Sequence, residues 1–280
     1  ETERAMKFKR KLEKNGVNVD NQTAIEKMAG SPMASGGTLI LENKKKNVLP
    51  VSTSKLNIRG GLLQNNGRYI INVNEMGKKI VMIEIVVYAQ ASDENDLSKT
   101  AAQENLFSEI GRKIEDIKNR LAELDRDICV VIGGDFNCYL EPSLDKSSKK
   151  GETSEALWQL MAQHDLVDIY REAHLVTEDN DSNREYTFKQ HKYEKDGRGN
   201  ILLDENGDKR KKEIKTRIDL FLISNRLKNI STCEIHPFNK KLSPDHAPVI
   251  LEINFGNMTD YIKESVDKVR GTNKMNTRPD

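Results

Sequence analysis

One segment in the middle of the chain, residues 127–137 (DICVVIGGDFN), restricts the possible folds most strongly. Its five consecutive apolar residues are too few for a buried helix and rich in β-branched side chains, which is typical of a strand buried on both faces. Two glycines follow, and then Asp135 and Asn137, which point to the same side of an extended chain. Together they could position water, a metal ion or a phosphate oxygen. An Asx-rich turn after a strand has the same composition, so the segment alone leaves both interpretations open.

Two amphipathic helices are predicted around this strand. The first precedes it, and Thr100-Ala101-Ala102-Gln103 has the form of a capping box that would begin it. Its apolar residues recur at steps of three and four, which predicts one buried stripe: Leu106, Ile110, Ile114, Ile117, Leu121 and Leu124. The second helix is predicted over residues 153–164, with Leu157, Trp158 and Met161 buried.

The other apolar runs predict strands. Residues 68–73 and 80–88 form a hairpin around Gly77, and further strands are expected at 186–188, 217–224, 230–237 and 248–253. No internal repeat is evident. Hairpins combined with strand–helix–strand units predict an α+β fold of two packed sheets with helices outside them.

Composition narrows the classes of function. The net charge is +1, so a nucleic-acid site would have to be local rather than a property of the whole surface. The three cysteines are odd in number and lack paired spacing, which fits a reducing, intracellular compartment better than a disulfide framework or a zinc site. No apolar run approaches membrane-spanning length and no secretory signal is visible, so no membrane partner is predicted.

Several polar side chains stand at predicted strand ends. Each has an ordinary structural explanation: Asp219 could pair with Arg217, for example, and Asp245-His246 could be a simple turn. Together they supply carboxylates for a hard cation and a histidine that a second acid could orient. Such a set suits metal-assisted phosphodiester hydrolysis, with a basic rim holding the polyanion. The residues are Tyr88, Asp135, Asn137, Asp219, Asp245 and His246.

Five motifs, taken in order, resemble the endonuclease/exonuclease/phosphatase superfamily, which includes DNase I and the apurinic endonucleases. They are Val-Tyr-Ala (87–89), Gly-Asp-Phe-Asn (134–137), Tyr-Thr-Phe (186–188), Arg-Ile-Asp-Leu-Phe-Leu-Ile-Ser (217–224) and Ser-Pro-Asp-His (243–246). Within the superfamily, residues 165–170, 185–188 and Leu144-Asp145-Lys146 are most similar to the endonuclease domain of non-LTR (LINE-type) retrotransposons.

The resemblance implies a fold and its limits. The expected fold is a four-layer α/β/β/α sandwich over residues 1–255, lacking its first strand–helix–strand unit and followed by a polar tail at 256–280. A charged insertion is expected at about 189–215. Its basic run, Lys209, Arg210, Lys211 and Lys212, is either a DNA-contacting hairpin element or a solvated segment, and the interleaved acidic residues favour the solvated interpretation.

The resemblance also implies site roles. Asp135 would align or activate water, Asn137 would bind the phosphate and the water, and Asp219 would orient His246 against the scissile phosphate. Tyr88 would donate to a phosphate oxygen or assist the leaving group.

Asp245 and Glu1 would bind the metal, Mg²⁺ or Mn²⁺. Glu1-Thr2 resembles the family's Gln-Glu-Thr motif, although an arbitrary terminal residue would look the same.

The leading hypothesis is therefore a Mg²⁺-dependent endonuclease that nicks DNA and leaves a 3′-hydroxyl to prime reverse transcription. Its partners would be DNA and a reverse transcriptase, fused to the chain or encoded with it, and its location would be nuclear. One alternative is another phosphodiesterase or phosphatase of the same superfamily, acting on lipid or RNA. The other is a truncated, non-catalytic nucleic-acid-binding relic.

Overall fold

The computed structural model describes most of the chain from residue 68 to residue 255. The described ranges are 68–76, 80–91, 97–123, 126–148, 151, 153–174, 185–238 and 245–255, together with the short strands β1 (Val17–Val19), β2 (Leu41–Asn43) and β3 (Leu49–Pro50). Strands β1 and β2 pair antiparallel. The expectations for Glu1, for Leu124 and for the tail at 256–280 lie outside these residues.

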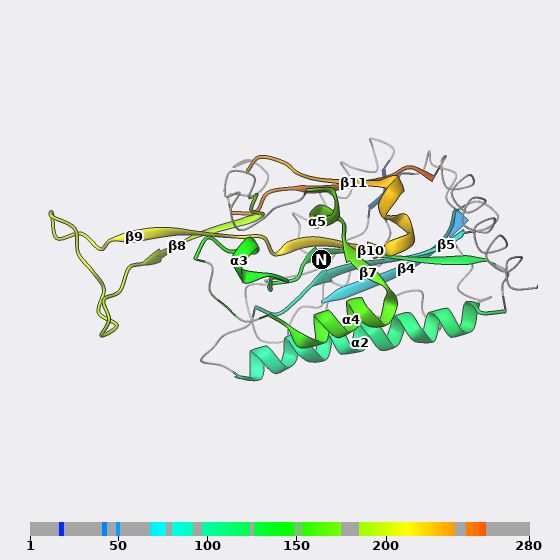
Figure 1. Ribbon diagram of the computed structural model, residues 1–280, viewed down its shortest axis with the longest axis horizontal. Coiled ribbons are helices and arrows are strands. Elements are labelled where there is room, and N and C mark those ends of the chain that lie inside the picture. The colour runs from blue at the N-terminus through cyan, green and yellow to red at the C-terminus, as the bar shows by residue number, and fades with distance from the viewer. Residues whose placement is uncertain are drawn as a thin grey trace, which may run out of the picture.

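A six-stranded sheet forms the centre of the molecule (Figure 1), in the order β3-β4-β5-β6-β10-β7. Its strands are β4 (Tyr69–Met76), β5 (Ile80–Tyr88), β6 (Asp127–Asp135), β10 (Asp219–Ser224) and β7 (Leu166–Asp168), besides β3. Only β5 and β6 are parallel neighbours. The predicted hairpin and the predicted core strand are both confirmed, and β6 continues through the two glycines to Asp135.

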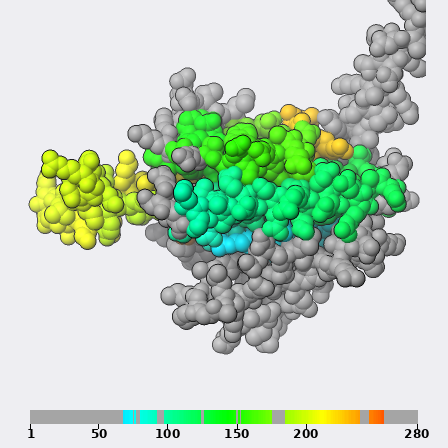
Figure 2. Space-filling model, turned by 90° about the horizontal axis from the view of Figure 1, so that it is seen from below, coloured from blue at the N-terminus to red at the C-terminus, as the bar shows by residue number. Residues whose placement is uncertain are grey.

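Helix α2 (Leu97–Leu121) makes the crossover that the parallel pair β5–β6 requires. It packs beside α4 (Glu155–His164) against one face of the sheet, as Figures 1 and 2 show. The predicted stripe is buried, but the helix begins three residues before Thr100, so the predicted capping box is wrong. None of the helices in the described ranges is long and apolar enough to span a membrane.

Helix α4 begins after Ser154, whose hydroxyl accepts a hydrogen bond from the Leu157 amide at 3.1 Å. The prediction that Trp158 is buried is wrong, because 46% of it is exposed. Leu157, Leu160 and Met161 form the buried stripe of this helix, and Trp158 lies about 100° around the helix from Leu157.

The opposite face of the sheet packs against a two-stranded sheet, β11 (Ser231–Ile235) and β12 (Val249–Ile253). Helix α5 (Ile169–Ala173) and the 3-10 helix η2 (Asn225–Ile230) contact β11. The short helix α3 (Pro142–Asp145) follows β6. The predicted α+β fold with two packed sheets is confirmed.

Strands β8 (Phe188–Tyr193) and β9 (Lys211–Thr216) form a hairpin that projects away from the body (Figures 1 and 2). Beyond it, residues 194–210 contain two successive turns that begin eight residues apart. Each begins with an aspartate, Asp196 or Asp204, whose Oδ1 accepts hydrogen bonds from the amides two and four residues later at 2.8–2.9 Å. Glycines three residues after each aspartate have φ of +87° and +84°. The two turns therefore have the same form, and aspartate and glycine are the residue types that both share at matching positions.

Candidate active site

The register of three strands gathers the first three site residues. Asp135, at the end of β6, pairs with Tyr88 of β5 on one side and with Asp219 of β10 on the other. Side chains alternate along a strand, and Val87 and Leu220, next to Tyr88 and Asp219, face α2 and α4. Tyr88, Asp135 and Asp219 therefore share the opposite face, at one end of the sheet.

The two glycines before Asp135 permit close approach of the neighbouring strands. A Cβ on Gly134 would lie 2.0 Å from the Val87 carbonyl oxygen, and its φ of +138° is one that other residues rarely adopt. A Cβ on Gly133 would lie 2.3 Å from the Phe221 ring. Both positions therefore require glycine, because the neighbouring strands leave no room for a side chain there.

Asp135 and Asn137 form an Asx turn and a polar pair at once. The Asn137 amide nitrogen donates to Asp135 Oδ1 at 2.9 Å, and its side-chain Nδ2 donates to Asp135 Oδ2 at 3.1 Å and to the Ala89 carbonyl at 2.9 Å. Asn137 has a φ of +49°, in the left-handed region. The interpretation of this segment as an Asx turn is therefore confirmed, and the turn itself orients the Asp135 carboxylate.

Burial and the neighbouring charge of Asp219 raise the pKa of Asp135 to about 6, against the opposing effects of the Asn137 hydrogen bonds and of His246. Carboxylate oxygens of Asp135 and Asp219 lie within 4.8 Å of one another. The two ionised groups therefore repel one another unless a proton or a cation lies between them. The electrostatics of the site therefore favour a bound cation at neutral pH.

His246 is held by contacts on two sides. Its Nδ1 lies 3.0 Å from Asp219 Oδ2, and its ring lies 4.8 Å from the Phe188 ring between centroids. The hydrogen bond to Asp219 is the main cause that raises the pKa of His246 above its ordinary value, although partial burial opposes it. Phe188 is the first residue of the hairpin, so the base of the hairpin packs directly on this histidine.

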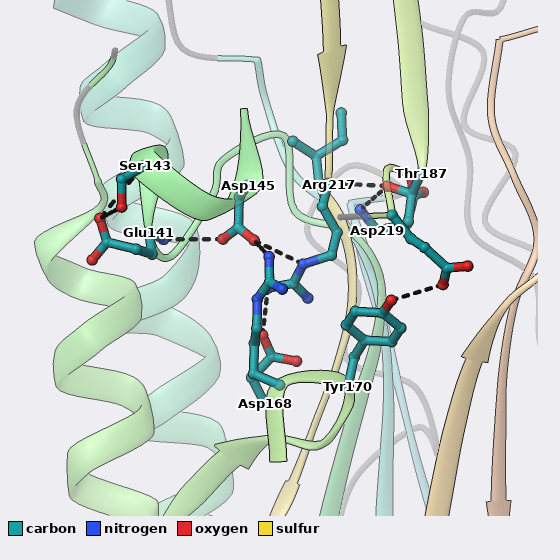
Figure 3. A network of polar contacts seen from close by, with 11 residues as sticks. Glu141, Ser143, Asp145, Asp168, Tyr170, Thr187, Arg217 and Asp219 are labelled. Carbon is teal, nitrogen blue, oxygen red and sulfur yellow. Dashed lines mark hydrogen bonds and ion pairs between the residues drawn. The ribbon is translucent and has the colours of Figure 1, made fainter. Parts of the chain in front are cut away.

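A buried polar network supports the start of β10 (Figure 3). The Thr187 hydroxyl accepts hydrogen bonds from the amides of Ile218 and Asp219, both at 3.0 Å. Arg217 is fully buried and donates to Asp145 Oδ1 at 2.8 Å and to Asp168 Oδ2 at 2.6 Å. The alternative that Asp219 pairs with Arg217 is therefore wrong. Sequence reasoning did not find the supporting role of this network, although Leu144-Asp145-Lys146 marked one part of it.

Arg68 places a positive charge beside Tyr88. Its guanidinium carbon lies 5.1 Å from the centre of the Tyr88 ring, and its Nη2 donates to Gln90 Oε1 at 2.8 Å. The Tyr88 amide donates to the Arg68 carbonyl at 2.7 Å, so the two residues are also tied through their backbones. Tyr88 therefore lies between a cation and the two carboxylates of the site.

Asp135, Asp219 and His246 each offer a ligand atom, and these atoms lie within 4.8 Å of one another. Two carboxylate oxygens suit a hard divalent cation, which often keeps several water ligands. Of the predicted metal ligands, Asp245 is exposed and lies outside this group, with its carbonyl accepting from the Lys189 amide at 2.9 Å. Glu1 lies outside the described residues.

The four predicted basic contact residues are not equivalent. Lys209 and Lys211 place their ammonium groups 5.5 and 5.7 Å from the centre of the Tyr193 ring. Arg210 forms an ion pair with Glu194 at 2.9 Å, and Lys212 lies opposite Lys192 across the hairpin. Lys209 and Lys211 thus share one face with an aromatic ring that is 46% exposed.

Comparison with known proteins returns solved structures only, since neither a protein-family model nor a curated protein sequence matches the chain. An AP endonuclease from Archaeoglobus fulgidus is 19% identical with a TM-score of 0.41, over 69% of each chain. The endonuclease domain of TRAS1, a telomere-specific non-LTR retrotransposon, is 11% identical with a TM-score of 0.43, over 85% of this chain and 80% of that one. TDP2 from C. elegans is 13% identical with a TM-score of 0.45, over 91% of this chain and 63% of that one.

Proposed function

We propose that this chain is a divalent-metal-dependent phosphodiesterase that acts on DNA as an endonuclease. One observation carries the proposal: three adjacent strand ends bring Tyr88, Asp135 and Asp219 together, and Asp219 holds the imidazole of His246. Phosphodiester hydrolysis needs a positioned water, a donor for the leaving oxygen and stabilisation of the phosphate charge. This cluster contains residue types suited to each of these tasks.

Water and phosphate would be handled by the Asp135–Asn137 pair. Asp135 aligns the attacking water, because the two hydrogen bonds from Asn137 orient its carboxylate. Asn137 binds a non-bridging phosphate oxygen together with the water. Bound Mg²⁺ or Mn²⁺ would neutralise charge that develops on the phosphate. Asp135 and Asp219 offer carboxylate oxygens for it within the described residues, and Asp245 and Glu1 are the ligands that the sequence resemblance implies.

His246 would contact the scissile phosphate from the other side. Asp219 is hydrogen-bonded to Nδ1, so exchange of a proton with the substrate would use Nε2. The raised pKa of His246 keeps more of it protonated near neutral pH, which suits a group that stabilises negative charge or donates a proton. Tyr88, beside the Arg68 guanidinium, would donate its hydroxyl to a phosphate oxygen or to the leaving group.

The hairpin would supply the contact to DNA outside the site. Its two strands carry Lys189, Lys192, Lys211, Lys212 and Lys215 against a single acidic residue, Glu213. Each strand has six residues, so the paired region extends roughly 20 Å. Because β8 begins beside His246, a duplex bound by these five lysines would lie next to the candidate active site. This assignment departs from the solvated interpretation that the interleaved acids favoured, since Glu194 is paired and the other four acids lie in the distal loops.

Within DNA substrates, the retrotransposon-like motifs support single-strand nicking that leaves a 3′-hydroxyl for a reverse transcriptase in the nucleus. The test is incubation of the chain with supercoiled plasmid in Mg²⁺ and in EDTA. We expect conversion to open circles in Mg²⁺ only, loss of conversion in His246→Ala, and nicks that a polymerase extends without end repair. Absence of nicking by the unaltered chain, with no effect of His246→Ala, would contradict the proposal.

A further inference from the structure

Helix α2 contributes one buried polar side chain to the two segments that follow the strand ends of the candidate active site. Gln103 is only 2% exposed, and its Nε2 donates to three backbone carbonyls: that of Gln90 at 2.7 Å, Asn137 at 3.2 Å and Phe136 at 3.3 Å. Gln90 follows the end of β5, and Phe136 and Asn137 follow the end of β6. One amide therefore joins the two segments that leave the sheet at the site.

These contacts act on the residue of the site with the least favourable backbone conformation. Asn137 has a φ of +49°, in the left-handed region, which is less favourable than extended backbone even though asparagine tolerates it better than other non-glycine residues. Gln103 binds the carbonyl of Asn137 from the helix side, while the Asn137 side chain donates to the Ala89 carbonyl from the other side. The conformation of Asn137 is thus held at both its backbone and its side chain.

Asn137 in turn orients Asp135 through two hydrogen bonds. We infer that Gln103 is a positioning residue for the reaction: it holds Asn137 in its left-handed conformation and, through Asn137, aims the Asp135 carboxylate. The inference deepens the proposed function and rests on it. Gln103 itself touches neither Asp135 nor any substrate-facing atom of the site; its described contacts are backbone carbonyls.

The alternative role is purely structural, because three backbone carbonyls would lose their donor in a variant of Gln103 that lacks the amide. A double-mutant cycle separates the two roles. The variants are Gln103→Leu, which keeps the volume and removes the donor, Asn137→Ala, and the combination of both. Ile117→Val, in the same helix and likewise buried, is the control for a small loss of packing far from the site.

We expect Gln103→Leu to lower kcat for plasmid nicking by about 100-fold, with a change in KM below about threefold, because a misplaced general base affects the chemical step more than binding. In the Asn137→Ala background the same substitution should change kcat by less than about threefold. Ile117→Val should keep the kcat of the unaltered chain. Equal effects of Gln103→Leu in both backgrounds would overturn the inference. Gln103→Asn, which retains a buried amide but shortens it, is measured beside Gln103→Leu in case the latter does not fold.

A second measurement does not depend on activity. Hydrogen exchange of the Asn137 amide, which donates to Asp135 Oδ1, should be faster in Gln103→Leu than in the unaltered chain, while amides of the β4–β5 ladder keep their rates. If the unaltered chain does not nick DNA, the proposed function fails, yet this result still decides whether Gln103 holds Asn137. Unchanged exchange at Asn137 would overturn the inference.

Discussion

Asp219 lies directly opposite Asp135 across the antiparallel pairing of β6 and β10. With Tyr88 on the other side of Asp135, the register of three strands alone places the three side chains together. A slip of one residue in either pairing would turn one of them to the helix-covered face. The candidate site therefore depends on strand register more than on loop conformation.

Asp135→Asn should stabilise the metal-free protein at neutral pH while it removes nicking. The folded-state pKa of Asp135, about 6, lies above its ordinary value of 3.8, so its contribution to stability is present below about pH 4 and is lost as the pH rises through 6. After a discount for partial solvent screening, the variant should gain about 1–2 kcal/mol over the unaltered chain between pH 4 and 7.5. Urea unfolding in EDTA at both pH values measures this gain. An equal difference between the two proteins at both pH values would contradict it.

Asp219→Asn should lower the pKa of His246. The hydrogen bond to Asp219 raises that pKa above 6.5, so its stabilising contribution is full below about pH 6.5 and is lost as the pH rises through the folded-state value. An NMR titration of the His246 ring proton follows the change directly. His236, in an exposed segment, serves as the internal control. The prediction is wrong if the two proteins give the same midpoint for His246.

Gly134→Ala should destabilise the protein far more than Gly199→Ala. Both positions have positive φ, but a Cβ at Gly134 would meet the Val87 carbonyl at 2.0 Å, whereas nothing lies within 4 Å of one at Gly199. We expect losses of roughly 2–5 kcal/mol and about 1 kcal/mol respectively. The free energies of unfolding in urea give the comparison, and similar losses at both positions would mean that β5 and β6 do not approach as closely as described.

Arg217→Met should cost about 3–5 kcal/mol, because it leaves the carboxylates of Asp145 and Asp168 buried without the guanidinium that joins them. Arg226→Met is the matched control, since its ion pair with Asp127 is exposed on both sides and should contribute less than about 1 kcal/mol. Urea unfolding of both variants provides the measurement. A loss at Arg217 no larger than that at Arg226 would argue against the buried network.

Replacing Lys209 and Lys211 together by alanine should weaken DNA binding and reduce its dependence on salt. If each lysine neutralises one phosphate, the slope of log K against log salt concentration should fall by about 1.8. Fluorescence anisotropy of a labelled duplex across a salt series measures the slope. Arg198→Ala, an exposed cation of the distal loops, should leave it unchanged. A double variant with the slope of the unaltered chain would assign DNA contact elsewhere.

Sequence reasoning succeeded where a pattern is local. The structure confirms the apolar run of β6, the β4–β5 hairpin and the stripe of α2. Each of these patterns lies within one short, continuous segment of the sequence. It was less successful at the ends of elements. The residues around Thr100 have the pattern of a helix cap, yet the helix begins at Leu97. Gln103, the last residue of that pattern, instead donates hydrogen bonds to backbone carbonyls such as that of Gln90.

The relationships that build the site are not local. Asp135 and Asp219 are opposite one another only because strands separated by more than 80 residues pair in one register. The buried fork of Arg217 between Asp145 and Asp168 likewise joins three distant segments, and no spacing in the sequence distinguishes it from a surface arginine. Motif order suggested that these residues meet; their partners required the three-dimensional structure.

The most direct test of the account is the rate of supercoiled-plasmid nicking in Mg²⁺ by the unaltered chain and by Asp219→Asn, measured side by side at equal folded concentration. If Asp135, Asp219 and His246 form one phosphodiesterase site, the substitution should lower kcat by at least about 100-fold, because it removes the carboxylate charge that orients His246 and raises its pKa. Equal nicking rates for the two proteins would contradict the account.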